Sequence, residues 1–356
     1  MFAVIMAGGS GTRFWPISRK KRPKQLLKIG GSEPMIVETC NRLQPIVQDR
    51  EIIVILGDLH KKETQGLLKH RDIHLVAEPV GRNTGPCIGL GAIYARYLGC
   101  EGAVAFLPAD HFIGDPSSFV KSLERAGKVA ESGGIVTLGI IPTRPETGYG
   151  YIHRADAISG SGQSIYKVSE FVEKPDLAKA EEYLLSGEYF WNGGIFVATP
   201  DAILDEIRQC LPDLYHGLKQ LEKVIGTESF EDVFSQVYSD LESVSFDYGI
   251  METTKAPVFV LPCDCGWSDV GSWKSLYELK TAEYDSENNL SEGEVLCIDC
   301  KGSFVSNASG RMIACLGVEH LLVVDTEDAV LIADLERSQD IRKIVDMLEE
   351  RGNNLL

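Results

Sequence analysis

Short runs of apolar, β-branched residues alternate with helical segments through the first 140 residues, and this alternation limits the fold more than any other feature. The apolar runs cover residues 2–6, 51–56, 73–77, 103–107 and 135–140, and the helical segments between them cover 34–43, 61–68, 84–98 and 117–131. Near-continuous apolar strands separated by helices are typical of a parallel sheet that is covered on both faces. We therefore expect an α/β fold whose ligands bind at the carboxyl ends of the strands.

The pattern changes along the rest of the chain. Helices are expected over 176–185, 200–224 and 230–238, with an aromatic-rich strand over 190–198. Closely spaced short strands follow at 294–298, 302–306, 311–316, 321–325 and 329–333, before a last helix over 338–351 whose apolar stripe holds Ile341, Ile344, Val345 and Leu348. We expect a large domain over 1–284 with a Rossmann-like mixed sheet and helices on both faces. A small domain over 285–356 should form a β-roll or left-handed β-helix with a terminal helix.

Composition and charge argue against several classes of partner. The chain has 35 Lys and Arg against 52 Asp and Glu, a formal net charge of −17, so neither nucleic acid nor a membrane surface is expected to bind. No charged leader and no long apolar segment is present, which predicts a cytoplasmic protein. The nine cysteines lie mostly singly in apolar surroundings, as reduced thiols do. The spacing of Cys263, Cys265, Cys297 and Cys300 leaves a zinc site as a minor alternative to plain strand cysteines.

A glycine-rich loop follows the first apolar run directly, with the sequence Ala7-Gly8-Gly9-Ser10-Gly11-Thr12. Glycines allow a tight turn and a close approach of the backbone to a ligand, and consecutive N–H groups in such a turn form an anion-binding concavity. The dinucleotide fingerprint would need a further glycine where Phe14 stands, and the Gly-Lys-Ser/Thr ending of a P-loop is absent. The loop is therefore interpreted as a phosphate-binding loop of a third kind.

Cations gather just after this loop. The segment 13–28 is strongly basic within an acidic chain. Arg13 offers a planar fork for phosphate oxygens, and Lys24 offers a point charge. These two side chains are expected to bind one triphosphate from two sides.

Two aspartates are candidate ligands for a divalent cation. Asp110 follows the fourth apolar run, where a buried parallel strand would place it at the ligand-binding edge of the sheet. A carboxylate oxygen there suits Mg²⁺, although an aspartate in this position also commonly caps a helix. Asp269, within Gly266–Trp273, is the second candidate.

The string AGGSGTRFWPISRKKRPKQ, residues 7–25, resembles the signature of the nucleotidyl-sugar pyrophosphorylases. Its FWP, SR and PKQ parts resemble the form found in mannose-1-phosphate guanylyltransferases, and the similarity extends over nearly the whole chain. The resemblance implies that GMP passes from GTP to α-D-mannose 1-phosphate, giving GDP-mannose and pyrophosphate. It also implies that Asp110 and Asp269 bind catalytic Mg²⁺, while Arg13, Lys24 and Lys174 neutralise phosphate charge.

The same resemblance assigns the remaining site residues. Nucleotide binding is implied for Ala7, Gly8, Gly9, Ser10, Gly11, Thr12, Glu78, Arg82, Asn83 and Thr84. Sugar binding is implied for Asp110, Tyr149, Gly150, Glu173 and Asn192. Thr84 also has a simpler interpretation as a helix cap. Pro175 is expected to keep Lys174 extended at the end of a strand. Glu173 and Lys174 would then point to opposite faces. The resemblance nevertheless implies that both side chains reach the ligand.

The chain departs from the family pattern at two glycines. Gly85 stands where alanine is usual, with little effect expected, and Gly193 stands where serine is usual, which would loosen the sugar pocket or alter the sugar preference.

Several alternatives stay open at this stage. The same reaction with another sugar 1-phosphate or nucleoside triphosphate is the nearest one, and a catalytically inert, ligand-sensing relative is another. An NAD-linked oxidoreductase is disfavoured by the missing third glycine. The chain is too short for the fused phosphomannose isomerase domain of some relatives, so a second activity is not expected. The oligomeric state is not determined by the sequence, and a homodimer is one option.

Overall fold

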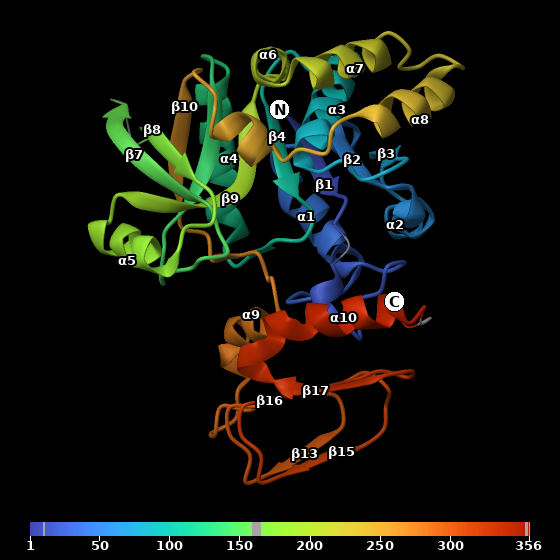
Figure 1. Cartoon of the computed structure of the whole chain (residues 1–356), viewed down its shortest axis with the longest axis vertical. Helices are drawn as coiled ribbons and strands as arrows, with labels where there is room; N and C mark the ends of the chain where they lie inside the picture. Colours follow the sequence, from blue (N-terminus) through green and yellow to red (C-terminus); the bar gives the residue numbers. More distant parts are fainter. Residues whose placement is uncertain (10, 159–164, 353–354, 356) are drawn as a thin grey trace. The chain divides into compact units, whose positions relative to one another are not determined.

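The chain forms two compact units in the computed structural model, which describes residues 1–9, 11–158, 165–352 and 355 (Figure 1). The first unit contains Met1–Gly8, Thr39–Ala109 and Ile113–Trp267, and the second contains Gly9–Glu38, Asp110–Phe112 and Ser268–Leu356. Two short strands, β5 (Phe112–Ile113) and β11 (Trp267–Ser268), include points where the chain passes from one unit to the other. The boundary expected near residue 285 lies inside the second unit and stays a prediction about sequence domains.

A mixed sheet organises the first unit. Its strands lie in the order β3-β2-β1-β4-β9-β6-β10-β8-β7. They are β1 (Phe2–Ala7), β2 (Ile52–Gly57), β3 (His74–Glu78), β4 (Val104–Pro108), β6 (Ile135–Ile140), β7 (Tyr151–Ile158), β8 (Ile165–Val172), β9 (Tyr189–Ala198) and β10 (Val258–Cys263). The strands β3, β2, β1 and β4 are parallel, whereas β9 runs antiparallel to both β4 and β6. The predicted mixed Rossmann-like sheet is confirmed.

Both faces of this sheet are covered. Successive side chains of a strand point to opposite faces, yet every residue of Ile135–Ile140 and every residue from 52 to 56 is buried. On one face, Val4, Ile53 and Phe106 pack in a core with side chains of α3 and α6 to α8. Helix α4 packs against β4, β6, β9 and β10.

The helices of the first unit follow the predicted periodicity closely, with one correction. They are α1 (Met35–Leu43), which begins in the second unit, α2 (Lys61–Leu67), α3 (Thr84–Tyr97), α4 (Pro116–Ala130), α5 (Leu177–Ser186), α6 (Pro200–Cys210), α7 (Pro212–Glu222) and α8 (Phe230–Asp240). The single helix expected over 200–224 was wrong. Pro212 lacks the N–H that a continuous helix would use, so α6 ends before it and α7 begins at it.

The second unit contains a β-helix. Its strands are β12 (Leu290–Glu292), β13 (Val295–Ile298), β14 (Phe304–Asn307), β15 (Ile313–Leu316), β16 (Leu321–Asp325) and β17 (Val330–Asp334). Strands β12, β14 and β16 pair in parallel within one sheet, which ends with the antiparallel β17, and β13 and β15 form a second, parallel sheet. From β12 to β16 the chain thus alternates between two sheets as it advances (Figure 1). The buried residues Leu290, Phe304 and Leu322 lie in register, one per turn of the coil. The predicted C-terminal β domain is confirmed as a β-helix.

Two helices, α9 (Trp273–Leu279) and α10 (Ile341–Glu350), complete the core of the second unit. Trp273 contacts the rings of both Phe14 and Phe304, at centroid distances of 5.2 and 5.6 Å. On α10, Ile341 and Val345 are buried in this core and Leu348 packs against it, but Ile344 is exposed, so the predicted apolar stripe is narrower than expected. Among the described residues, no helix is both long and apolar enough to cross a membrane.

Candidate functional site

The end of the glycine loop, Gly11 and Thr12 in the second unit, lines a cavity of about 570 Å³, which we call the loop cavity. It is lined by Gly11, Thr12, Arg13, Phe14, Lys20, Lys24, Asp110, His111, Asp269, Val270, Gly271, Arg342, Val345, Asp346 and Glu349. Gly11 has φ +57 and precedes the 3₁₀ turn Thr12–Phe14, so the loop depends here on a conformation that glycine adopts without strain. Ser10 lies outside the described residues.

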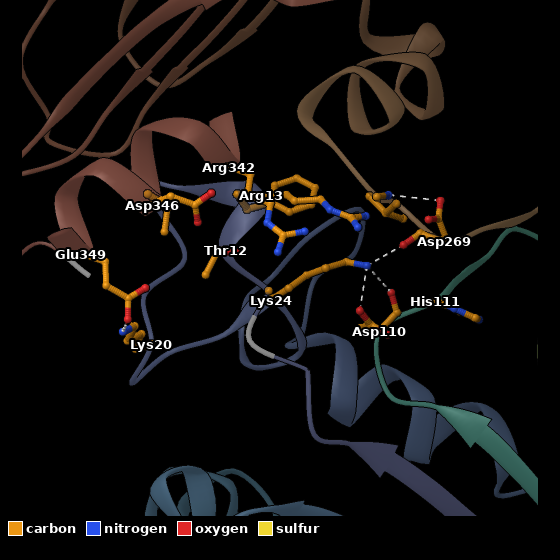
Figure 2. Close-up of a pocket in the computed structure, with 15 residues that line it drawn as sticks. Thr12, Arg13, Lys20, Lys24, Asp110, His111, Asp269, Arg342, Asp346 and Glu349 are labelled. Carbon is orange, nitrogen blue, oxygen red and sulfur yellow. Dashed lines mark hydrogen bonds and ion pairs between the residues drawn. The ribbon is translucent and has the colours of Figure 1, made fainter. Parts of the chain in front are cut away.

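Lys24 is the central cation of this cavity. Its side chain is only 6% exposed, and its Nζ donates hydrogen bonds to the Asp110 carbonyl (2.7 Å), to Asp110 Oδ2 (3.0 Å) and to the Asp269 carbonyl (2.5 Å), as Figure 2 shows. An ammonium group has three donors, and all three are engaged. Lys24 therefore holds together the two segments that carry the candidate metal ligands. The predicted contact of Lys24 with a phosphate stays a prediction.

The two aspartates form a donor set that suits a hard divalent cation. Burial raises the pKa of Asp110, but the ammonium of Lys24 and then His111 outweigh it, so the pKa lies below its usual value and the carboxylate is ionised. Asp269 Oδ1 accepts a hydrogen bond from the backbone N–H of Gly271 (3.2 Å). A Cβ at Gly271 would lie 2.7 Å from Asp269 Oδ2, so glycine keeps the space beside this oxygen open. Two carboxylates in a phosphate-sized cavity fit Mg²⁺.

Helix α10 contributes three side chains that the sequence analysis did not identify. Arg342, Asp346 and Glu349 line the loop cavity, and Glu349 forms an ion pair with Lys20 of the basic segment (Figure 2). The sequence indicated only that these residues lie beside the buried stripe of an amphipathic helix. The pattern gave no indication of what they face.

The loop after β3 holds the residues implied in nucleotide recognition. Glu78 is 4% exposed and accepts a hydrogen bond from the hydroxyl of Tyr238, and burial raises its pKa. A Cβ at Gly8 would lie 3.3 Å from Glu78 Oε2, so these two residues adjoin each other. Arg82 donates to the carbonyl of Ser239. The loop is thus anchored to the end of α8.

Asn83 and Thr84 make two different hydrogen bonds at the start of α3. Asn83, with φ +69, accepts a hydrogen bond from the Thr84 N–H (2.9 Å), and the Thr84 hydroxyl accepts one from the Phe246 N–H (2.8 Å). The cap that the sequence assigned to Thr84 is therefore provided by Asn83. Base recognition by Glu78, Arg82, Asn83 and Thr84 stays a prediction.

Four of the residues implied in sugar binding, Tyr149, Gly150, Glu173 and Asn192, lie in the first unit, whereas Asp110 belongs to the second. Asn192 N–H donates to the Gly150 carbonyl (2.8 Å), and a Cβ at Gly150 would lie 2.5 Å from Glu173 Oε2. Glu173, Gly150 and Asn192 therefore form one cluster. Residue 150 must be glycine there, because the Glu173 side chain occupies the space that a Cβ would need. Tyr149 stands edge-on to Trp191 and Trp267, with ring centroids 5.2 and 5.4 Å away.

Lys174 corrects one expectation. Its φ is +48, so it is not extended, and its ammonium pairs with Glu173 Oε1 instead of pointing to the opposite face. Strand β8 has already ended at Val172, which frees the backbone to turn before Pro175. Burial lowers the pKa of Lys174, but the Glu173 carboxylate outweighs it and the pKa is raised, so the side chain stays charged.

Asp247 is a further member of this cluster that the site prediction omitted. It begins the π-helix Asp247–Met251, and its Oδ1 accepts a hydrogen bond from Asn192 Nδ2 (2.7 Å). Asn192 Oδ1 in turn accepts from the Gly194 N–H (2.9 Å), so the amide is held at both ends. Burial, followed by the Glu173 carboxylate, raises the pKa of Asp247 to about 6. A short π-helical turn often marks a functional site.

All nine cysteines are free thiols. Within the part of the chain that the structure describes, no three His, Cys, Asp or Glu side chains are arranged to hold a metal ion.

Comparison with known proteins identifies related families. Residues 2–286 match the nucleotidyl transferase family, and residues 293–348 match the mannose-phosphate isomerase/GMP-like β-helix domain. A mannose-1-phosphate guanylyltransferase of Klebsiella pneumoniae is 38% identical over 354 residues, which cover 98% of this chain and 74% of the relative. Mannose-1-phosphate guanylyltransferase RfbM of Salmonella typhimurium is 38% identical over 99% of this chain and 73% of its own length.

A solved structure agrees with these sequence matches. A Thermus thermophilus protein described as a mannose-1-phosphate geranyltransferase superposes with a TM-score of 0.86 at 33% identity, covering 98% of this chain and 99% of the other. A Helicobacter pylori protein described as a mannose-6-phosphate isomerase shares the fold with a TM-score of 0.60 at 21% identity. With sequence matches of this identity over almost its whole length, the chain belongs to the mannose-1-phosphate guanylyltransferase family of nucleotidyl transferases.

Proposed function

We propose that this protein transfers GMP from GTP to α-D-mannose 1-phosphate, giving GDP-mannose and pyrophosphate. The observation that carries the proposal is the position of Lys24, whose ammonium donates to the segments of both Asp110 and Asp269 in a cavity that begins at the glycine loop. Family membership at 38% identity supports the choice of substrates.

The reaction needs positioning and charge neutralisation more than proton transfer. A phosphate oxygen of mannose 1-phosphate forms a bond to the α-phosphorus of GTP, and the bond from the α-phosphorus to the bridging oxygen breaks on the opposite side. The electron pair leaves with pyrophosphate. Because the attacking oxygen is already anionic, no general base is required.

The second-unit residues are assigned to the triphosphate. Arg13 faces the loop cavity and offers a bidentate fork, and Gly11 and Thr12 bring backbone close to the phosphates. Lys24 keeps the two aspartate segments in place and adds positive charge beside them. Asp110 and Asp269 would hold Mg²⁺, which when bound offsets the negative charge of the phosphate oxygens.

The first-unit cluster is assigned to the sugar phosphate. Glu173 accepts hydrogen bonds from sugar hydroxyls, and Lys174 binds the phosphate. One amide hydrogen of Asn192 is bonded to Asp247, and the other donates to the sugar. Glu78, Arg82, Asn83 and Thr84 are assigned to the guanine base, with Ala7 and Gly8 approaching the nucleotide closely.

The decisive experiment is a matrix of nucleoside triphosphates against sugar 1-phosphates with pyrophosphate release as the readout. GTP with mannose 1-phosphate should lead this matrix. A different leading pair would overturn the assigned specificity, and no turnover with any pair would favour an inert, ligand-sensing relative.

A pair of variants tests the assigned residues. Asp110→Asn should lose most of kcat while remaining folded, because a neutral amide is a poor Mg²⁺ ligand. Asp264→Asn is a matched control, since Asp264 is exposed and does not line the loop cavity. Near-normal kcat for folded Asp110→Asn would contradict the metal assignment.

We place the reaction in the cytoplasm, supported by the nine free thiols, which suit a reducing compartment. A homodimer stays a prediction, which light scattering would test.

A further inference from the structure

The C-terminal helix α10 directs one stripe of polar residues at the loop cavity. Its rotation about its own axis is set by Ile341 and Val345, which are 1% and 4% exposed in the core of the second unit. Arg342, Asp346 and Glu349 recur at intervals of four and three residues, which places them on one face of the helix. All three line the loop cavity, and Figure 2 shows them projecting toward the basic segment.

The charges of the loop cavity are only partly paired. Lys24 forms an ion pair with Asp110, and Lys20 forms one with Glu349. In contrast, neither Arg13 nor Arg342 makes a hydrogen bond or ion pair with any residue that the structure describes. Asp346 lies one turn from Arg342, but no ion pair joins these two among the described residues.

Two guanidinium groups in one cavity, both without a partner among the residues that the structure describes, call for an anionic ligand. Each guanidinium can bind two oxygens of a phosphate group in a bidentate arrangement. The nearby carboxylates would repel a phosphate, but Asp110 is paired with Lys24, and a bound cation would offset its remaining charge together with that of Asp269. The anion that fits this arrangement is a polyphosphate that arrives with a divalent cation.

We propose that Arg342 is a phosphate-binding residue that, together with Arg13, binds the pyrophosphate portion of the nucleotide. The C-terminal helix then belongs to the active site, and the β-helix domain serves to hold it there. This inference rests on the proposed function, because it takes GTP as the nucleotide and pyrophosphate as the product.

The test compares Arg342→Gln with Lys343→Gln. Each variant removes one positive charge from adjacent positions of the same helix, but Lys343 is 72% exposed, pairs with Asp340 and does not line the loop cavity. Calorimetry with Mg²⁺ would measure the binding of GTP, pyrophosphate, GMP and mannose 1-phosphate, and thermal unfolding would show that both variants remain folded.

Arg342→Gln should weaken the binding of GTP and of pyrophosphate about tenfold or more, the effect of losing a charge-assisted hydrogen bond, and should leave GMP and mannose 1-phosphate unchanged. Arg342→Lys should recover part of the loss. Equal affinities for Arg342→Gln and Lys343→Gln would overturn the inference, as would an equal loss for all four ligands. Failure of the wild-type protein to bind pyrophosphate would overturn it too.

The two proposals fail separately. If the wild-type protein binds pyrophosphate in an Arg342-dependent manner but makes no GDP-mannose, the proposed function is wrong and the phosphate-binding role of Arg342 stands.

Discussion

Replacement of Asp247 by Asn should stabilise the protein at neutral pH and change its stability little below pH 4. The Asp247 carboxyl is half-buried and faces Glu173, Lys174 and Asn192. Burial and the Glu173 carboxylate disfavour the ionised form of Asp247, whereas the Asn192 hydrogen bond and the Lys174 charge favour it. The first two effects are larger, so the pKa of Asp247 rises from the ordinary 3.8 to about 6. An asparagine in its place carries no charge and keeps an oxygen that can accept the hydrogen bond from Asn192.

The sign of the pH dependence follows from proton linkage. Between pH 3.8 and about 6, the folded state keeps the Asp247 proton while the unfolded state has lost it, so the free energy of unfolding of the wild-type protein falls as pH rises. The gap of about 2.2 pH units at 1.36 kcal/mol each gives a loss of about 3 kcal/mol. Partial exposure to water reduces this to roughly 1–3 kcal/mol at pH 7 and above.

Urea unfolding of the wild type and of Asp247→Asn at half-unit steps from pH 4 to pH 8 measures this difference. It should be small at pH 4, grow between pH 4 and pH 6.5, and then level off. Glu242→Gln is a matched control, because Glu242 is an exposed carboxylate nearby in the sequence. A difference that stays flat with pH, or that shrinks as pH rises, would refute the argument.

Further predictions concern close contacts of named atoms. Lys24→Met should abolish turnover and lower the free energy of unfolding by roughly 1–3 kcal/mol, since it removes the buried partner of Asp110, whose side chain is 36% exposed; kinetics and urea unfolding measure the two effects. Gly11→Ala should lower kcat about tenfold or more, because its Cβ would lie 2.7 Å from the Cβ of Lys24, and unchanged kinetics would contradict this. Gly85→Ala should cost roughly 1–3 kcal/mol of stability, since its Cβ would lie 2.7 Å from the Val244 carbonyl oxygen, whereas Gly193→Ser, whose nearest contacts are at 3.4 Å, should cost about 1 kcal/mol or less. The opposite order in thermal unfolding would count against both.

Gly85 illustrates how structure changes a sequence argument. The family resemblance implied alanine at this position, and glycine was expected to have little effect. In this chain Gly85 N–H donates to the Val244 carbonyl at 2.9 Å, and the same carbonyl fills the space that a methyl group would need. In this chain the position requires glycine, because the neighbouring backbone leaves no space for a methyl group.

Much of the fold was predictable because it depends on local patterns. The parallel strands β1 to β4 and the helices between them match the alternation of apolar runs and helical segments within a few residues. The antiparallel strands β7 and β8 were not predicted, apart from a strand end at Glu173 and Lys174, because their exposed residues weaken the apolar pattern. The break at Pro212 was predictable from the chemistry of proline, but the apolar pattern of 200–224 concealed it.

The candidate site divides in the same way. Motif and chemistry were enough to select Arg13, Lys24, Asp110 and Asp269, and the structure places all four at the loop cavity. The left-handed backbone of Lys174 could not be foreseen, because Pro175 favours an extended residue before it and only the surrounding chain overrides this preference. The support that Asp247 gives to Asn192 joins residues 55 positions apart and has no local signature.

The sequence by itself determined the class of fold, the glycine loop and the family, because periodicity and motif spacing express interactions between residues close along the chain. The tertiary structure alone decided that Lys24 bridges two aspartate segments and that Arg342 shares a cavity with Arg13, more than 300 positions away. An amphipathic pattern shows which stripe of a helix is buried. What the remaining faces meet depends on how distant apolar surfaces pack together, and no local pattern records that.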